Sequence, residues 1–109
     1  MSRKTEQIAA AMKDAIAQVI CRGLQDPRVQ GLVTITSLTV ADDLADATVN
    51  VSVLPGEKQE ATVEGLNAAA GHIRRELDRY IQMRRVPLIR FRSDASLKKQ
   101  LSEIGRAHV

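Results

Sequence analysis

Apolar residues along this chain change from helical spacing to strict alternation and back again. Over residues 2–22 they recur every three or four positions, which is typical of one face of an amphipathic helix. The stripe consists of Ile8, Met12, Ala15, Ile16, Val19 and Ile20. Ser2 or Thr5 suits the start of such a helix and Gly23 its end. The pattern therefore predicts a first helix, followed by a turn at Asp26-Pro27-Arg28.

Two runs with the period of a β-strand follow this turn. In residues 32–40 valine, isoleucine and leucine alternate with threonine, but the phase slips at Ser37, which indicates a β-bulge. Residues 47–53 alternate alanine or valine with threonine, asparagine and serine, so one face of this strand is buried. The connection between the two runs, Asp42 to Ala45, is short. We therefore expect the runs to form an antiparallel hairpin that ends at Pro55-Gly56.

Helical spacing returns between residues 57 and about 84. The second stripe consists of Val63, Leu66, Ala70, Ile73, Leu77 and either Tyr80 or Ile81. It passes through Gly71, and a glycine inside a helix costs about 1 kcal/mol relative to alanine, so we expect a kink or break there. Pro87 stops the helix and makes Val86 extended. Residues 88–92 then form a third short strand, with Ile89 and Phe91 on one side.

The predicted order is α-β-β-α-kink-α-β. We expect an α+β domain in which the third strand joins the hairpin and the helices cover one face of the three-stranded sheet. This domain is assigned to residues 1–97. Residues 94–96 begin either a last helical turn or a mobile tail, and residues 98–109 are assigned to a C-terminal tail.

Composition narrows the class of protein. The 109 residues are 44% hydrophobic and 27% charged, a balance typical of one small globular domain. Only two residues are aromatic, which argues against an RNA binder built on stacked aromatics. No apolar run is long enough to span a bilayer, and no signal-peptide pattern follows Arg3 and Lys4. The single cysteine, Cys21, excludes an internal disulfide and suits the reducing cytoplasm.

Positive charge is concentrated in the last third of the chain. Residues 1–30 carry a net charge of +2, residues 31–71 of −5 and residues 72–109 of +6. Seven arginines fall within nineteen residues: Arg74, Arg75, Arg79, Arg84, Arg85, Arg90 and Arg92. The planar guanidinium fork is well matched to phosphate, so this cluster favours a phosphate-binding surface over a merely solvated face. Arg3 and Lys4 are expected to add contacts from the start of the first helix.

Residues with catalytic or metal-binding potential do not form a recognisable site. Cys21 and the two histidines have no motif spacing, and we interpret Cys21 as structural or incidental. Asp42, Asp43 and Asp46 are interpreted as solvated residues of a turn rather than a cation site. No glycine-rich phosphate loop and no GxxG element is present. We therefore predict no catalytic residue, no metal site, no cofactor and no enzymatic activity.

Several segments together resemble one known family. They are DPR at 26–28 with VTIT at 33–36, ATVNVSV at 47–53, LNAAAGHIRREL at 66–77, RRVPLIRF at 84–91 and DASL at 94–97. In this order they resemble ribosome-binding factor A, and the resemblance covers residues 2–97. It implies a type II KH-like fold in which an Ala-x-Gly element replaces GxxG, and Ala69-Ala70-Gly71 matches that element. His72 stands where the family usually has an aromatic residue.

The resemblance also implies a function. Such proteins are bacterial assembly factors that bind immature 30S particles, act late in 16S rRNA maturation near its 5′-terminal helix, and leave before translation. They are monomers without cofactor or catalytic activity, and they are linked to cold adaptation. Here the arginines would neutralise rRNA phosphates while the kink at Ala69 and Gly71 lets the RNA backbone approach. Two alternatives stay open: a KH-like module for another RNA, and a protein-interaction domain with solvated arginines.

Overall fold

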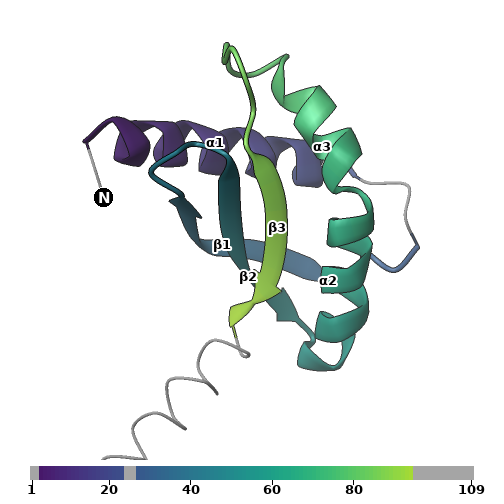
Figure 1. Cartoon of the computed structure of the whole chain (residues 1–109). Helices are drawn as coiled ribbons and strands as arrows, with labels where there is room; N and C mark the ends of the chain where they lie inside the picture. The colour runs from purple at the N-terminus through teal and green to yellow at the C-terminus, as the bar shows by residue number, and fades with distance from the viewer. Residues whose placement is uncertain (1–2, 24–26, 95–109) are drawn as a thin grey trace, which may run out of the picture.

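The computed structural model of the chain describes residues 3–23 and 27–94 (Figure 1). In chain order the elements are α1 (Arg3–Cys21), β1 (Leu32–Val40), β2 (Asp46–Leu54), the short 3-10 helix η1 (Gly56–Lys58), α2 (Gln59–Ala68), α3 (Ala70–Leu77) and β3 (Leu88–Ser93). The predicted order of helices and strands is confirmed. The helical turn or tail that the sequence suggested after β3, and the division at residue 97, fall outside the described residues.

The sheet has the strand order β1-β2-β3, so β2 is central. β1 and β2 pair antiparallel, as the hairpin prediction required, whereas β3 lies parallel to β2. In this register Val49 lies opposite Leu38 on one side and Phe91 on the other. The pairing of β1 with β2 shifts between Ile35 and Ser37, which confirms the predicted bulge.

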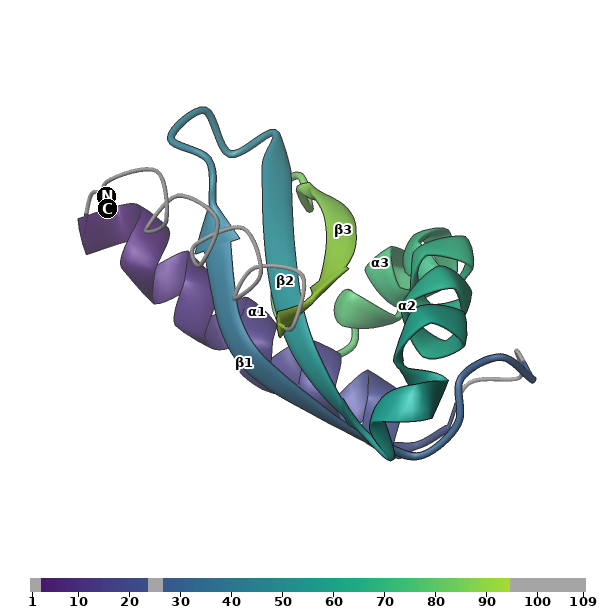
Figure 2. The ribbon, with the colours of Figure 1, turned by 90° about the horizontal axis from the view of Figure 1, so that it is seen from below.

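The core lies between one face of the sheet and the three helices. Every second residue of β2 is buried, and α1, α2, α3, β3 and Val40 of β1 contribute the rest of the core. The buried apolar side chains include Met12, Ile16, Val19, Ala47, Val49, Val51, Val53, Leu66, Ile73, Leu77 and Phe91. Seen from below, α1 runs along the hairpin while α2 and α3 lie beside β3 (Figure 2). The opposite face carries the part-exposed Thr48, Asn50 and Ser52, which confirms a sheet covered on one side.

Two polar side chains of α2 hold the helix in place, one through the sheet and one through the segment before β1. The Asn67 Nδ2 donates to the Phe91 carbonyl oxygen at 3.0 Å, and the Phe91 N–H donates to Asn67 Oδ1 at 2.8 Å. The buried Thr62 Oγ1 donates to the Gln30 carbonyl oxygen at 3.0 Å. Because these bonds join α2 to β3 and to the segment before β1, they set the position of the helix pair that follows.

The helix break lies at Ala69 rather than at Gly71. Ala69 has φ −89° and ψ 0°, and its N–H donates to the carbonyl oxygens of Gly65 and Leu66 at 3.0 and 3.1 Å. Gly71 instead lies in the first turn of α3. The predicted kink is therefore present, but glycine's low helix propensity does not mark its position.

The second helix of the pair also ends earlier than predicted. α3 stops at Leu77, and the N–H groups of Tyr80 and Ile81 both donate to the Leu77 carbonyl oxygen at 2.9 Å in the turn that follows. Tyr80 and Ile81 still pack against the core from this non-helical segment. The apolar stripe therefore extends beyond the end of α3, and the predicted helix end near Arg84 is wrong.

Candidate nucleic-acid interface

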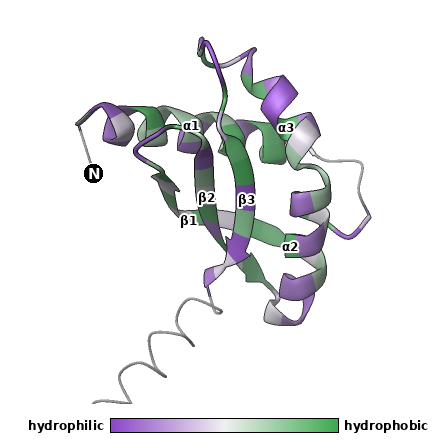
Figure 3. Ribbon diagram, viewed as in Figure 1, coloured by the Kyte–Doolittle hydropathy of each residue, from purple (hydrophilic) through white to green (hydrophobic). Residues whose placement is uncertain are grey.

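α3 and the segment that returns to β3 enclose a basic depression of about 390 Å³, which we call the arginine hollow. It is lined by Gly71, Arg74, Arg75, Asp78, Met83, Arg84, Arg85 and Val86. Hydrophilic residues occupy much of α3 (Figure 3). Four arginines face a single carboxylate in this set, so the hollow concentrates positive charge in a concave surface. Such a surface attracts polyanions.

Arg74 holds the wall of the arginine hollow in place. Its Nη2 donates to the Val86 carbonyl oxygen at 2.8 Å and so joins α3 to the segment before β3. The Nε of this half-buried side chain is itself buried and has no hydrogen-bond partner among the residues described. Arg74 was predicted from the sequence as a phosphate contact, but the geometry gives it a positioning role first.

Arg75, Arg84 and Arg85 are the accessible charges of the hollow. All three side chains are exposed. Within residues 3–23 and 27–94 no ion pair occupies any of these three side chains, whereas Arg79 pairs with Glu76. Hydrated, unpaired guanidinium groups at a concave surface are suited to bidentate contacts with phosphate oxygens. The structure thus brings together five of the predicted site residues, which are Gly71, Arg74, Arg75, Arg84 and Arg85.

The backbone is open at the edge of the hollow. Gly71 is exposed, and a Cβ placed there would meet no neighbouring atom within 4 Å. Ala69, at the helix break, is half-buried and packs against the core. A ligand can therefore approach the main chain at Gly71 more closely than at Ala69.

The other predicted arginines lie elsewhere. Arg79 follows α3 and does not line the hollow. Its Nε lies 3.6 Å from the Glu76 Oε2. Arg90 and Arg92 occupy the sheet face turned away from the helices, at the level of Thr48 and Asn50 of β2. Ile89 and Phe91 share the other, buried face of β3, as the sequence predicted. The seven arginines do not form one surface.

Arg3 and Lys4 begin α1 and are also remote from the hollow. At the other end of α1 the Arg22 guanidinium lies 5.5 Å from the centre of the Tyr80 ring, in the segment that follows α3. Eighteen helical steps separate Lys4 from Arg22, a length of about 27 Å. The exposed Lys4 is therefore a separate positive position at the far end of the helix.

Other chemistry finds little support in the part of the chain that the structure describes. There, no three histidine, cysteine, aspartate or glutamate side chains come close enough to hold a metal ion. Asp43 acts in the turn, where its Oδ1 accepts a hydrogen bond from the Ala45 N–H at 3.0 Å. Cys21 is exposed, and no described helix has the length and apolar character needed to cross a membrane.

Sequence reasoning did not identify Met83, Val86 or Asn67 as parts of this region. Met83 and Val86 line the hollow because the chain turns back after α3, and the sequence offered only Pro87 as a signal of that turn. Asn67 positions α2 through Phe91, which is 24 residues away in the sequence. No local pattern marks a contact of that kind.

Comparison with known proteins gives one consistent family. The family model for ribosome-binding factor A matches residues 4–104. Ribosome-binding factor A of Geotalea daltonii is 40% identical, with 96% of this chain and 90% of that protein covered. The protein of the same name from Clostridioides difficile is 38% identical over 88% of this chain and 75% of its own length.

Solved structures agree with the sequence relatives. The crystal structure of ribosome-binding factor A from Thermus thermophilus has a TM-score of 0.71 and 28% identity, covering 82% of this chain and 93% of that one. A model of the Thermus thermophilus protein, fitted into a cryo-EM map of its complex with 30S, has a TM-score of 0.61 and 25% identity over 85% and 93% of the two chains. On these matches, and on a fold that agrees with the KH-like arrangement, the chain belongs to the ribosome-binding factor A family.

Proposed function

We propose that this chain binds the immature small ribosomal subunit as an assembly factor and contacts its 16S rRNA through the arginine hollow. The observation that carries this proposal is the grouping of Arg75, Arg84 and Arg85, exposed and unpaired among the described residues, beside open backbone at Gly71. The family member from Thermus thermophilus that was fitted into a map of a 30S complex supports the choice of partner.

The contacts in this proposal are made mainly to phosphates. Each guanidinium that neutralises a phosphate releases condensed counterions, so binding weakens steeply as salt is raised. Base stacking contributes little, because Phe91 is in the core and Tyr80 packs against it. The chain therefore recognises the charge and shape of a folded RNA rather than a run of bases.

The proposed role is non-catalytic. By binding one arrangement of the rRNA better than others, the chain shifts the particle towards that arrangement. We place this action in the cytoplasm, late in 16S rRNA maturation and near the 5′-terminal helix, with release before translation. Ala69 and Gly71 serve the approach of the RNA backbone, and Arg79, Arg90, Arg92, Arg3 and Lys4 serve as outlying contacts.

Co-sedimentation tests the proposal directly. Purified protein is mixed with immature 30S, mature 30S and 70S particles at about 50 and about 200 mM salt, and the bound fraction is measured after centrifugation. We expect salt-sensitive binding to immature 30S and little binding to 70S. Equal binding to all particles and to bulk RNA would favour a general RNA-binding module, and no binding even at low salt would favour a protein-interaction domain. Either result overturns the proposed function.

A further inference from the structure

The two edges of the sheet differ in how they are covered. The outer edge of β3 is closed where the Asn67 side chain pairs with both backbone groups of Phe91. No backbone hydrogen bond joins the outer edge of β1 to any other described segment. Edge strands are usually protected from pairing by charged residues, proline or a bulge. The nine residues of β1 include no charged residue and no proline, and the strand has only the bulge between Ile35 and Ser37. β1 is therefore open to pairing with another strand.

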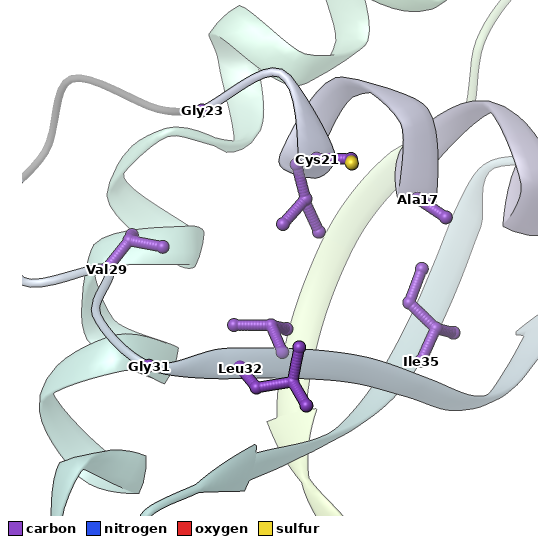
Figure 4. A pocket seen from close by; sticks show the side chains of 9 residues that line it. Ala17, Cys21, Gly23, Val29, Gly31, Leu32 and Ile35 are labelled. Carbon is purple, nitrogen blue, oxygen red and sulfur yellow. The ribbon is translucent and has the colours of Figure 1, made fainter.

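An apolar groove runs beside this open edge. It has a volume of about 420 Å³ and lies between the last turns of α1 and the first half of β1 (Figure 4). α1 contributes Ala17, Ile20 and Cys21, and β1 contributes Leu32, Val33 and Ile35. None of its lining residues is charged, and Leu32 is 65% exposed. Where a segment pairs with the first half of β1, every second side chain would turn toward this groove.

Charge indicates which class of partner the edge accepts. No lysine or arginine occurs between residues 31 and 57, so nothing along β1 neutralises a phosphate backbone. The exposed Asp42 and Asp43 come after Ala41, just beyond the end of β1, and attract basic side chains. The edge strand thus offers no positive charge of its own to a nucleic acid, and the aspartates suit a protein segment that carries lysine or arginine.

We propose that the outer edge of β1 and its groove bind an extended basic segment of a partner protein, which adds to the sheet as a fourth strand. Backbone hydrogen bonds supply affinity, and alternate apolar side chains in the groove supply specificity. About 26 Å separate Leu32 from Val40 along the strand, so roughly nine residues reach from the groove to the aspartates. Because β1 and β3 are opposite edges, this site and the arginine hollow can be occupied together.

Peptide selection tests the site without any ribosomal particle. Random twelve-residue peptides displayed on phage are selected on the full chain, and the enriched sequences are synthesised and titrated against two variants. Ala17→Lys places a long positive side chain in the groove, and Ala11→Lys makes the same change at an exposed position of α1 that does not line it. The melting temperatures of both variants show that they are folded.

We expect enriched peptides with apolar residues at alternate positions and lysine or arginine near one end. Their affinity should fall at least tenfold in Ala17→Lys and stay unchanged in Ala11→Lys. If no peptide is enriched, or if both variants bind equally, the proposal is wrong. Enriched peptides without basic residues would contradict the part assigned to Asp42 and Asp43.

Photo-crosslinking identifies what contacts the groove when the chain is bound to immature 30S. This experiment rests on the proposed function. Cys21, the single cysteine, is exposed at the groove and takes a benzophenone maleimide without further mutation. After co-sedimentation with immature 30S and irradiation, we expect adducts to a basic segment of a ribosomal protein. Adducts only to rRNA or to a second copy of this chain overturn the inference while leaving the proposed function intact. Failure to co-sediment overturns the proposed function. In that case the peptide selection alone tests whether the β1 edge binds a basic segment.

Discussion

Gly65 of α2 lies against Val29 so closely that a Cβ on the glycine would be 2.8 Å from the Val29 Cγ2 and 3.2 Å from its backbone nitrogen. Backbone on the opposing segment cannot retreat as a flexible side chain can. The absence of a side chain at Gly65 therefore allows the segment before β1 to pass directly over α2. Gly71, six residues further on, has no such neighbour.

This contrast predicts opposite effects of the same substitution. Gly65→Ala should lower the free energy of unfolding by about 1–3 kcal/mol, because it overpacks the contact with Val29. Gly71→Ala should raise it by up to about 1 kcal/mol, because alanine is the better helix former and the space is open. Urea unfolding of both variants measures the difference. Equal effects would show that the close approach is not maintained in solution.

Gly71 also provides a test of the proposed approach of an RNA backbone to the arginine hollow. Gly71→Leu should weaken binding to immature 30S at least threefold while the protein stays folded, because the added side chain occupies the open edge of the hollow. Ala61→Leu, at an exposed position of α2, is the matched control. Unchanged binding by the Gly71 variant would mean that RNA does not approach the main chain there.

Single alanine substitutions at Arg75, Arg84 and Arg85 should each weaken binding to immature 30S. Each should also reduce the slope of log affinity against log salt by about 1, the value for one lost phosphate contact. Lys58→Ala removes an exposed positive charge from η1, away from the hollow, and is expected to leave the slope unchanged. If the lysine variant changes the slope as much as the arginine variants, the net charge of the chain controls binding and the hollow does not.

Arg74 should contribute to the stability of the fold, whereas its neighbour Arg75 should not. Arg74→Met removes the hydrogen bond to the Val86 carbonyl and should lower the free energy of unfolding by about 1.5–3 kcal/mol. Arg75→Met, at an exposed position on the same helix, should change it by less than about 0.5 kcal/mol. Thermal unfolding of the two variants, monitored by circular dichroism, makes the comparison. Similar melting temperatures would rule out the positioning role.

Asn67 and Asn50 provide a second matched pair. Asn67→Ala leaves the N–H and the carbonyl of Phe91 without their partner and should cost about 2–3 kcal/mol. Asn50 donates from its Nδ2 to the Ser37 Oγ at 2.8 Å on the exposed face, where water replaces the lost bond, so Asn50→Ala should cost less than about 1 kcal/mol. Hydrogen exchange at Phe91 should accelerate in the first variant alone. Slow exchange there in Asn67→Ala would contradict the role given to this side chain.

The elements that the sequence could predict are those with a local cause. In a strand, the polarity of each residue reflects the face of the sheet on which its side chain lies. The alternation in β2 therefore follows from its one buried face, and the slip at Ser37 follows from the bulge. The parallel pairing of β3 and the bond between Asn67 and Phe91 depend on residues distant in sequence. The predicted end of α3 lies too late because Tyr80 continues the apolar stripe. Tyr80 packs against the core although it lies outside the helix, so the stripe does not mark the helix end.

The candidate site was predictable only as a stretch of sequence. Counting arginines identified the region, but β3 carries Arg90 away from the hollow, and Arg79 lies near Glu76 instead. Which arginines act together depends on where the chain turns after α3. That turn is set in part by the bond between Arg74 and Val86, which no spacing rule reveals.

The parallel pairing of β3 with the central strand has a consequence for synthesis of the chain. A parallel strand joins its neighbour only after the crossover formed by α2 and α3, so Phe91 reaches Val49 after every earlier element has been made. Until then the nascent chain exposes both edges of the hairpin formed by β1 and β2, although the arginines of α3 have already been translated. The growing polypeptide therefore carries the positive charge of the arginine hollow before it has a closed core, and synthesis is the period in which it is most open to mispairing.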